Sequence, residues 1–414
     1  MSGLAGRAVQ FLLLMFTAAG GMFARFAVGP LQEAVRVALS LSDNQMALLQ
    51  GPALALPMAV AAIPLGLLID RYSRVRLLSI FSALDMAGSL LTALATNFVL
   101  LFAARCLVGL AAAAISTTAF SMLGDLYAPD RRGRATMGVA ASQFAGMSAA
   151  FALGGVLLTM FGADRQSWQW TMLWLTSPLA VVMLLTLAMR EPSRTGSVIQ
   201  NPSARDSFVD LWRYRALITP LMAGLVLAEM AVLAVATWAS PTFSRGLALT
   251  PDRIGAIMAV ALLVSGVLGP MSGGFLADYC QRSGGPRRTL FALIGLALLS
   301  VPAALFAVAP GVVAANLLLV TFMTIITAIL VAGVTLFTII IPNELRGLCM
   351  ATLAGAQVVF GVGLAPVMVS VLSGAIGGPA MIGKALATSC VAAGLLGAAI
   401  FALGRRYFPR AAPL

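Results

Sequence analysis

Histidine is absent from this 414-residue chain, and cysteine occurs only four times. Without an imidazole, the chain lacks the side chain that most often serves acid–base catalysis and metal binding near neutral pH. The cysteines show no CxxC spacing, so the sequence predicts neither a zinc site nor a disulfide framework. A GxSxG turn and a glycine-rich phosphate loop are also missing. These absences argue against an enzyme and against ATP-driven transport, and we expect no cofactor and no metal.

Charge is scarce as well. Only 10% of the residues are charged, whereas 60% are hydrophobic and the mean hydropathy is +0.99. Apolar runs recur that are long enough to cross a hydrocarbon core of roughly 30 Å as helices. The sequence therefore predicts an all-α, polytopic membrane protein. We expect twelve spans, at residues 9–34, 45–68, 77–96, 99–126, 135–160, 168–189, 217–242, 252–276, 289–309, 311–341, 347–373 and 380–403.

The formal net charge of +12 follows the expected topology and does not indicate nucleic-acid binding. Most Lys and Arg residues fall in alternate connections, with clusters at 71–76, 131–134 and 282–288. The positive-inside rule then places both termini in the cytoplasm. We expect a multi-pass protein of the bacterial inner membrane, surrounded by membrane lipids.

A charged, Ser- and Pro-containing stretch divides the chain into two halves of six spans. We predict bundles at 1–189 and 217–414, joined by a cytoplasmic linker at 190–216. The two halves resemble each other in sequence. Asp70 ends one span, and Asp278 ends another span 208 positions later. Two pseudo-symmetric halves around a midplane site are a recurring plan of transporters.

One charged segment interrupts the apolar sequence, "GLLIDRYSRVRLL" at 66–78. It resembles the loop between helices 2 and 3 of the major facilitator superfamily. "RCLVG" (105–109) and "PDRRGRA" (129–135) resemble the family's helix 4 and loop 4–5 motifs. The resemblance implies a transporter with the major facilitator fold, working as a monomer.

The same resemblance implies a conformational latch on the inner side of the two halves. Its candidate residues are Gly66, Asp70, Arg71, Arg74, Arg131, Arg134 and Asp278. We expect Asp70 to pair with Arg71 or Arg74, and Gly66 to let another helix approach closely. The alternative is that the arginines only anchor the loops on the inner side, and we prefer it for Arg76, Arg287 and Arg288.

Within the superfamily, 38–74 and 119–135 read much like the bacterial spinster-like branch. That branch usually carries an acid directly before the helix 1 arginine and a second one in helix 4. Here Ala24 and Ala112 stand at those positions. Proton coupling by the usual acids is therefore not expected.

Four ionisable residues stand out within predicted spans, where charge is costly and usually functional: Arg25, Asp85, Arg105 and Glu229. By family resemblance, Arg25, Arg105 and Glu229 lie on cavity helices and are our substrate-binding or coupling candidates. Arg105 could instead bond a backbone carbonyl. Asp85 lies on an outer helix, and we predict a structural role for it.

Glu229 and Arg25 fall at matching depths of pseudo-equivalent helices. We predict that they pair in one conformation and that a proton on Glu229 weakens the pair. A static packing pair is the alternative.

The leading hypothesis is a secondary active transporter that moves a small organic solute, anionic or amphipathic, by alternating access. Protons are a candidate coupling ion for symport or antiport. A multidrug efflux antiporter and a non-transporting membrane sensor on the same fold are the alternatives.

Overall fold

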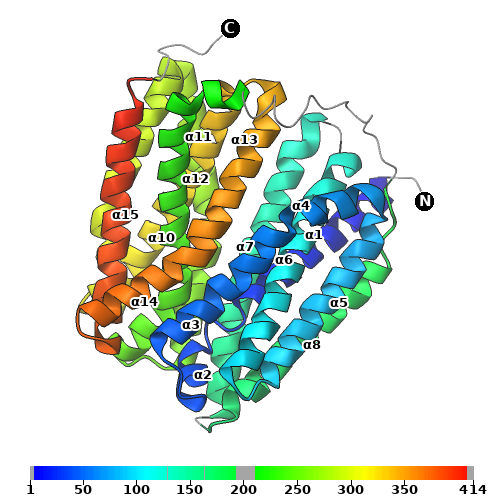
Figure 1. The fold of residues 1–414 in the computed structure, drawn as a ribbon, viewed down its shortest axis with the longest axis vertical. Helices are drawn as coiled ribbons and strands as arrows, with labels where there is room; N and C mark the ends of the chain where they lie inside the picture. Colours follow the sequence, from blue (N-terminus) through cyan, green and yellow to red (C-terminus); the bar gives the residue numbers. More distant parts are fainter. Residues whose placement is uncertain (1–3, 128, 163, 193–209, 408–414) are drawn as a thin grey trace. The chain divides into compact units, whose positions relative to one another are not determined.

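The computed structural model describes residues 4–127, 129–162, 164–192 and 210–407. Those residues form helices and connections, without a β-strand (Figure 1). The first half contains α1 (Leu4–Phe26), α2 (Gln32–Ala38), α3 (Asp43–Gln50), α4 (Pro52–Arg71), α5 (Arg74–Ala93), α6 (Phe98–Leu126), α7 (Pro129–Phe161) and α8 (Ser167–Leu187). The second half contains α10 (Arg215–Leu247), α11 (Pro251–Ala303), η1 (Ala304–Val308), α12 (Val312–Ile340), α13 (Asn343–Ala356), η2 (Gln357–Leu364), α14 (Ala365–Ala375), η3 (Pro379–Met381) and α15 (Ile382–Gly404).

Local sequence signals set several helix starts. Ser42 begins α3 with a capping box, in which its hydroxyl accepts from the Gln45 N–H and Gln45 bonds back to the Ser42 N–H. Ser73 and Asn97 cap α5 and α6 through their side-chain oxygens. These caps satisfy N–H groups that a helix start would otherwise leave unbonded.

Eleven helical segments among the described residues are long and apolar enough to span a membrane. One of them, Pro251–Val308, has 58 residues. At about 1.5 Å per residue it would far exceed a bilayer as a single rod. It is broken at Gly284 and Gly285, and Gly285 has a φ of 70°, which favours glycine. The span predicted at 252–276 falls inside this segment, and the one predicted at 289–309 ends one residue beyond it.

By contacts the chain forms two compact units. Unit 1 is Met1–Val198 with Ala248–Leu263, and unit 2 is Ile199–Leu247 with Val264–Leu414. In unit 1, α5 packs against α6 and α8, while α1 packs against α7 and α6. Buried side chains of α1, α4, α5, α6 and α7 form one apolar core there. The first turns of α11 belong to this unit by contacts, although they follow α10 in the chain.

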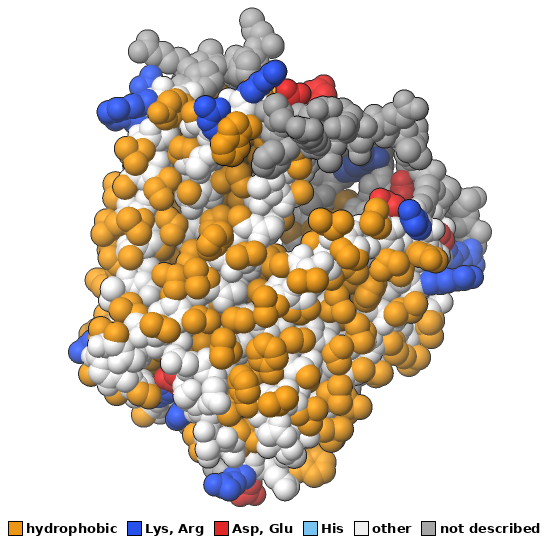
Figure 2. All heavy atoms as spheres, viewed as in Figure 1, with side chains coloured by type: hydrophobic (Ala, Val, Ile, Leu, Met, Phe, Trp, Pro, Cys, Tyr) orange, Lys and Arg blue, Asp and Glu red, His pale blue; other side chains and the backbone are white. Residues whose placement is uncertain are grey.

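In unit 2, α10 packs against α15, α12 and η2. Its core includes an aromatic series in which Phe306 lies between Phe243 and Phe322, with ring centroids 6.4 Å and 5.8 Å apart. Figure 2 shows hydrophobic side chains over the middle of the helices and charged ones near the helix ends. Val60 and Phe275 are 77% and 70% exposed, as expected of side chains that face lipid.

Candidate functional site

Arg105 of α6 is fully buried in unit 1 and bonds the end of α1. Its Nη2 donates to the backbone carbonyl of Arg25 at 2.6 Å, and its Nη1 lies 3.5 Å from the carbonyl of Ala24. The last carbonyls of a helix lack intrahelical donors and carry partial negative charge, so a guanidinium is a suitable partner. Arg105 therefore bonds backbone carbonyls, which was one of its two predicted roles.

Arg25 occupies the last turn of α1 and is half-buried. Its guanidinium carbon lies 5.2 Å from the ring centroid of Phe26, within the range of a cation–π contact. The neighbouring Ala24 is buried, and a carboxyl group is absent at that position. Two cationic residues thus meet at one end of α1.

Glu229 of α10 is half-buried in unit 2 and lies against the π-helical segment η2. A methyl group added at Gly361 would come within 2.8 Å of the Glu229 Cγ. The absent side chain at Gly361 therefore makes room for the acid. π-helical turns are rare and are frequent at functional sites. Since Glu229 and Arg25 lie in different units, their pairing stays a prediction.

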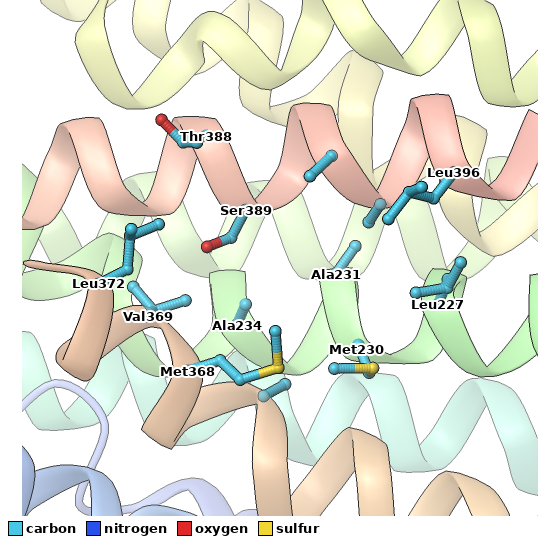
Figure 3. Close-up of a pocket in the computed structure, with 13 residues that line it drawn as sticks. Leu227, Met230, Ala231, Ala234, Met368, Val369, Leu372, Thr388, Ser389 and Leu396 are labelled. Carbon is cyan, nitrogen blue, oxygen red and sulfur yellow. The ribbon is translucent and has the colours of Figure 1, made fainter.

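An apolar hollow of about 170 Å³ lies in the same unit (Figure 3), and Glu229 is not among its lining residues. It lies between α10, α14 and α15, and its large lining residues are Leu227, Met230, Met368, Val369, Leu372 and Leu396. Figure 3 shows the Ser389 hydroxyl on the side of α15 that faces the other two helices. Flexible methionines adapt to apolar ligands of varied shape. The hollow has the lining of a site for a hydrocarbon chain.

The candidate latch residue Arg74 is held within unit 1. Its Nη1 pairs with Asp125 at the end of α6, and its Nε lies 3.0 Å from Glu191 Oε1. Glu191 also accepts from the Ser73 hydroxyl at 2.6 Å and from the Val75 N–H at 2.9 Å. Burial raises the pKa of Glu191, but these hydrogen bonds and those from Arg74 outweigh it, so the pKa lies below its usual range. This cluster joins the start of α5 to α6 and to the segment after α8.

Most of the other candidate latch residues are exposed, unlike Arg74. Asp70, Arg71, Arg134 and Asp278 are exposed. A methyl group at Gly66 would meet no heavy atom within 4 Å, so the close helix approach expected there is not made in this structure. The backbone of Arg131 lies in α7, but its side chain lies outside the described residues. The pairing of Asp70 and the latch itself remain predictions.

Sequence reasoning missed Asp125, Glu191 and the hollow. A signal for the two acids existed, since Asp125 ends one predicted span and Glu191 follows another, both beside a cluster of arginines. The hollow carries no comparable signal, because its lining consists of ordinary span residues.

Eleven candidate spans among the described residues, with buried charge at a helix end, define a polytopic helical membrane protein. The family model of the Major Facilitator Superfamily matches residues 14–351. The chain belongs to this superfamily.

Similarity to individual proteins agrees with this assignment. A bacterial homolog of the human lysosomal transporter spinster, solved in an inward-facing and unoccupied conformation, superposes with a TM-score of 0.82 over 98% of both chains at 20% identity. Protein spinster of Drosophila melanogaster is 25% identical over 62% of this chain and 43% of its own length. A triacylglyceride transporter of Mycolicibacterium hassiacum is 33% identical over 33% of this chain and 24% of its own length. The expected resemblance to the spinster-like branch is confirmed.

Proposed function

We propose that this protein moves an anionic, amphipathic solute with a hydrocarbon part across the bacterial inner membrane by alternating access. The observation that carries the proposal is the pair of arginines at the end of α1, with Arg105 fully buried. Buried cations in a membrane protein mark a substrate or ion pathway by default. A negatively charged head group is the ligand that their charge favours.

Two further observations support the hydrocarbon part. The hollow between α10, α14 and α15 is apolar, and its volume suits several methylene groups. The similar proteins include one named for the transport of triacylglycerides, which are themselves lipids. We propose that this hollow of unit 2 accepts hydrocarbon chains.

Thermal unfolding of the purified protein tests the proposal with three single-chain amphiphiles of equal length. One carries a phosphate head, one a neutral hydroxyl and one a quaternary ammonium. A ligand at a hundred times its dissociation constant adds about 2.7 kcal/mol of stability. We expect stabilisation by the phosphate form, reduced in Arg25→Gln. Stabilisation by the ammonium form alone would overturn the proposed charge and favour a multidrug exporter.

Movement of the same phosphate amphiphile into proteoliposomes separates a transporter from a sensor. We expect concentrative uptake under a proton gradient, with Glu229 as a coupling acid. Glu229→Gln should flatten the dependence of uptake on pH, because the amide cannot release a proton. An unchanged pH profile in that variant would remove Glu229 from the coupling step. Binding without uptake would indicate a sensor.

A further inference from the structure

Three polar residues follow one face of α5 at helical spacing: Ser82, Asp85 and Ser89. All three are buried, and Asp85 is only 2% exposed. Oγ of both serines and Oδ1 of Asp85 have no hydrogen-bond partner among the described residues. Buried side-chain oxygens without a partner are uncommon in native proteins, and three on one face are a stronger departure.

The missing bonds are not a general property of α5. Ser79 donates to the Val75 carbonyl at 3.1 Å, and Thr92 donates to the Gly88 carbonyl at 2.8 Å. Serine and threonine often satisfy themselves in this way inside helices. Ser82 and Ser89 do not, so their hydroxyls remain available to a further group between them. Asp85 lies between the two in sequence and on the same face.

The helices packed against α5 bring few charges to this face. α8 carries no titratable side chain over Ser167–Leu187. α6 carries Arg105 and the thiol of Cys106, and α1 carries Arg7 and Arg25. Of these groups, Arg105 acts electrostatically on Asp85, and Arg25 acts on Arg105.

Helices α5 and α6 lie very close here. A methyl group at Gly88 would come within 3.2 Å of the Ala104 carbonyl and 2.9 Å of Val108. Asp85 is one turn from Gly88 on α5, and Arg105 follows Ala104 on α6. The acid and the guanidinium therefore lie on neighbouring turns of two helices in close contact. Even so, the described residues include no ion pair between Asp85 and Arg105 within 4 Å.

Arg105 instead directs both terminal nitrogens to the carbonyls of α1, while its Nε, also buried, has no partner. A carboxylate buried without a hydrogen-bond donor is unfavourable, whereas a protonated carboxyl carries no charge and supplies a donor of its own. The arrangement therefore fits a neutral Asp85, with the Arg105 guanidinium bonded to the α1 carbonyls instead of to the carboxyl group. Loss of the proton would leave a carboxylate that attracts the guanidinium.

We propose that Asp85 is a proton-binding site inside unit 1, and that Arg105 exchanges the α1 carbonyls for Asp85 when the proton leaves. The carboxylate takes up one proton to form the neutral acid on the same helix face as the two serine hydroxyls. Release of the proton returns the charge and draws Arg105 toward α5. This assignment replaces the structural role predicted for Asp85, and it deepens the proposed transport function by naming a second site for protons.

The test observes the proton directly and does not need a substrate. Infrared difference spectra of the full chain in liposomes are recorded between about pH 5 and about pH 8. A protonated carboxyl gives a carbonyl stretch that the carboxylate lacks. We expect one such band to be lost in Asp85→Asn and kept in Glu229→Gln. Loss of the band in Glu229→Gln alone would overturn the proposal for Asp85.

A second variant keeps the test decisive if Asp85→Asn does not fold. Ser82→Ala with Ser89→Ala leaves the acid in place and should shift the band, because two polar groups on the same helix face as the carboxyl are gone. A band unmoved in the double variant contradicts the proposal. Replacement of potassium by sodium at constant pH should leave the band unchanged, and a sodium-dependent loss would indicate a sodium site instead. Failure of amphiphile uptake with the band intact would overturn the proposed function and not the proton site.

Discussion

Arg105 donates a hydrogen bond to the backbone carbonyl of Arg25, so two cationic residues from different helices meet through a side chain and a main chain. Their charges repel each other, yet the fold brings them together because a helix end offers carbonyls that the guanidinium can bond. The contact links α6 to the last turn of α1. The Arg25 guanidinium carbon itself lies 5.2 Å from the centroid of the Phe26 ring.

Arg105→Lys should destabilise unit 1 even though the charge is kept. A lysine ammonium lacks the planar fork that bonds two carbonyls, and it leaves one of them without a donor. We expect a loss of about 2 kcal/mol, the usual value for hydrogen bonds to a charged group. Thermal unfolding in detergent measures it. Arg76→Lys, at an exposed position of α5, is the matched control. Equal melting temperatures for the two variants would contradict the expectation.

Gly146→Ala should loosen the contact between α1 and α7. A methyl group at Gly146 would overlap the backbone carbonyl of Ala19, and a backbone atom cannot rotate away. Overpacking of this kind costs about 1–3 kcal/mol. Gly133→Ala on the same helix is the control, because a methyl group there meets nothing within 4 Å. The measurement is the melting temperature of both proteins, and no difference between them would refute the close contact.

Gly361→Ala should change transport more than stability. The added methyl group displaces the Glu229 side chain, which can move, and the backbone is not forced apart. We expect uptake of the phosphate amphiphile to fall about tenfold or more, with a melting temperature within a few degrees of the wild type. Gly355→Ala is the control, since that position has open space. Wild-type uptake in Gly361→Ala would show that the position of Glu229 does not matter.

The Glu191 cluster predicts a pH dependence of stability. The pKa of Glu191 lies below its ordinary value of about 4.3, so its stabilising effect is complete above that pH and is lost as the pH falls through the lower folded value. Wild type should therefore exceed Glu191→Gln in melting temperature at neutral pH. The difference should shrink below about pH 4. A constant difference across this range would show that the carboxylate charge contributes nothing.

Much of the fold could be predicted because membrane spans are recognisable in a sequence by their length and hydropathy. The predicted span at 99–126 differs from α6 by a single residue at its start. Breaks inside spans were less visible. The predicted span at 347–373 is divided into α13, the π-helical η2 and α14, and no residue in "QVVFGVGL" distinguishes a π-helix from an α-helix. Hydrogen-bond register within an apolar run depends on tertiary packing, which a single sequence does not record.

Candidate residues could be chosen from the sequence where charge stands against an apolar background, as at Arg25, Arg105 and Glu229, and their roles stay predictions. The role proposed for Asp85 could not be reached in this way, because a polar stripe on a helix predicts packing unless the hydroxyls are known to lack partners. The two acidic partners of Arg74 were missed because their distance from it in the sequence hides the contact. Asp125 and Glu191 come from distant parts of the chain, and only the fold brings them to one place.

The π-helical segment has a thermodynamic consequence for unit 2. Its Gly361 lies against Glu229, and the chain continues directly into α14, whose Met368 and Leu372 line the hollow. Under the proposed function, an apolar molecule in the hollow and a proton on Glu229 would act on opposite ends of one short piece of chain. Linkage then requires reciprocity: the factor by which protonation changes the affinity of the hollow equals the factor by which occupancy changes the affinity of Glu229 for its proton.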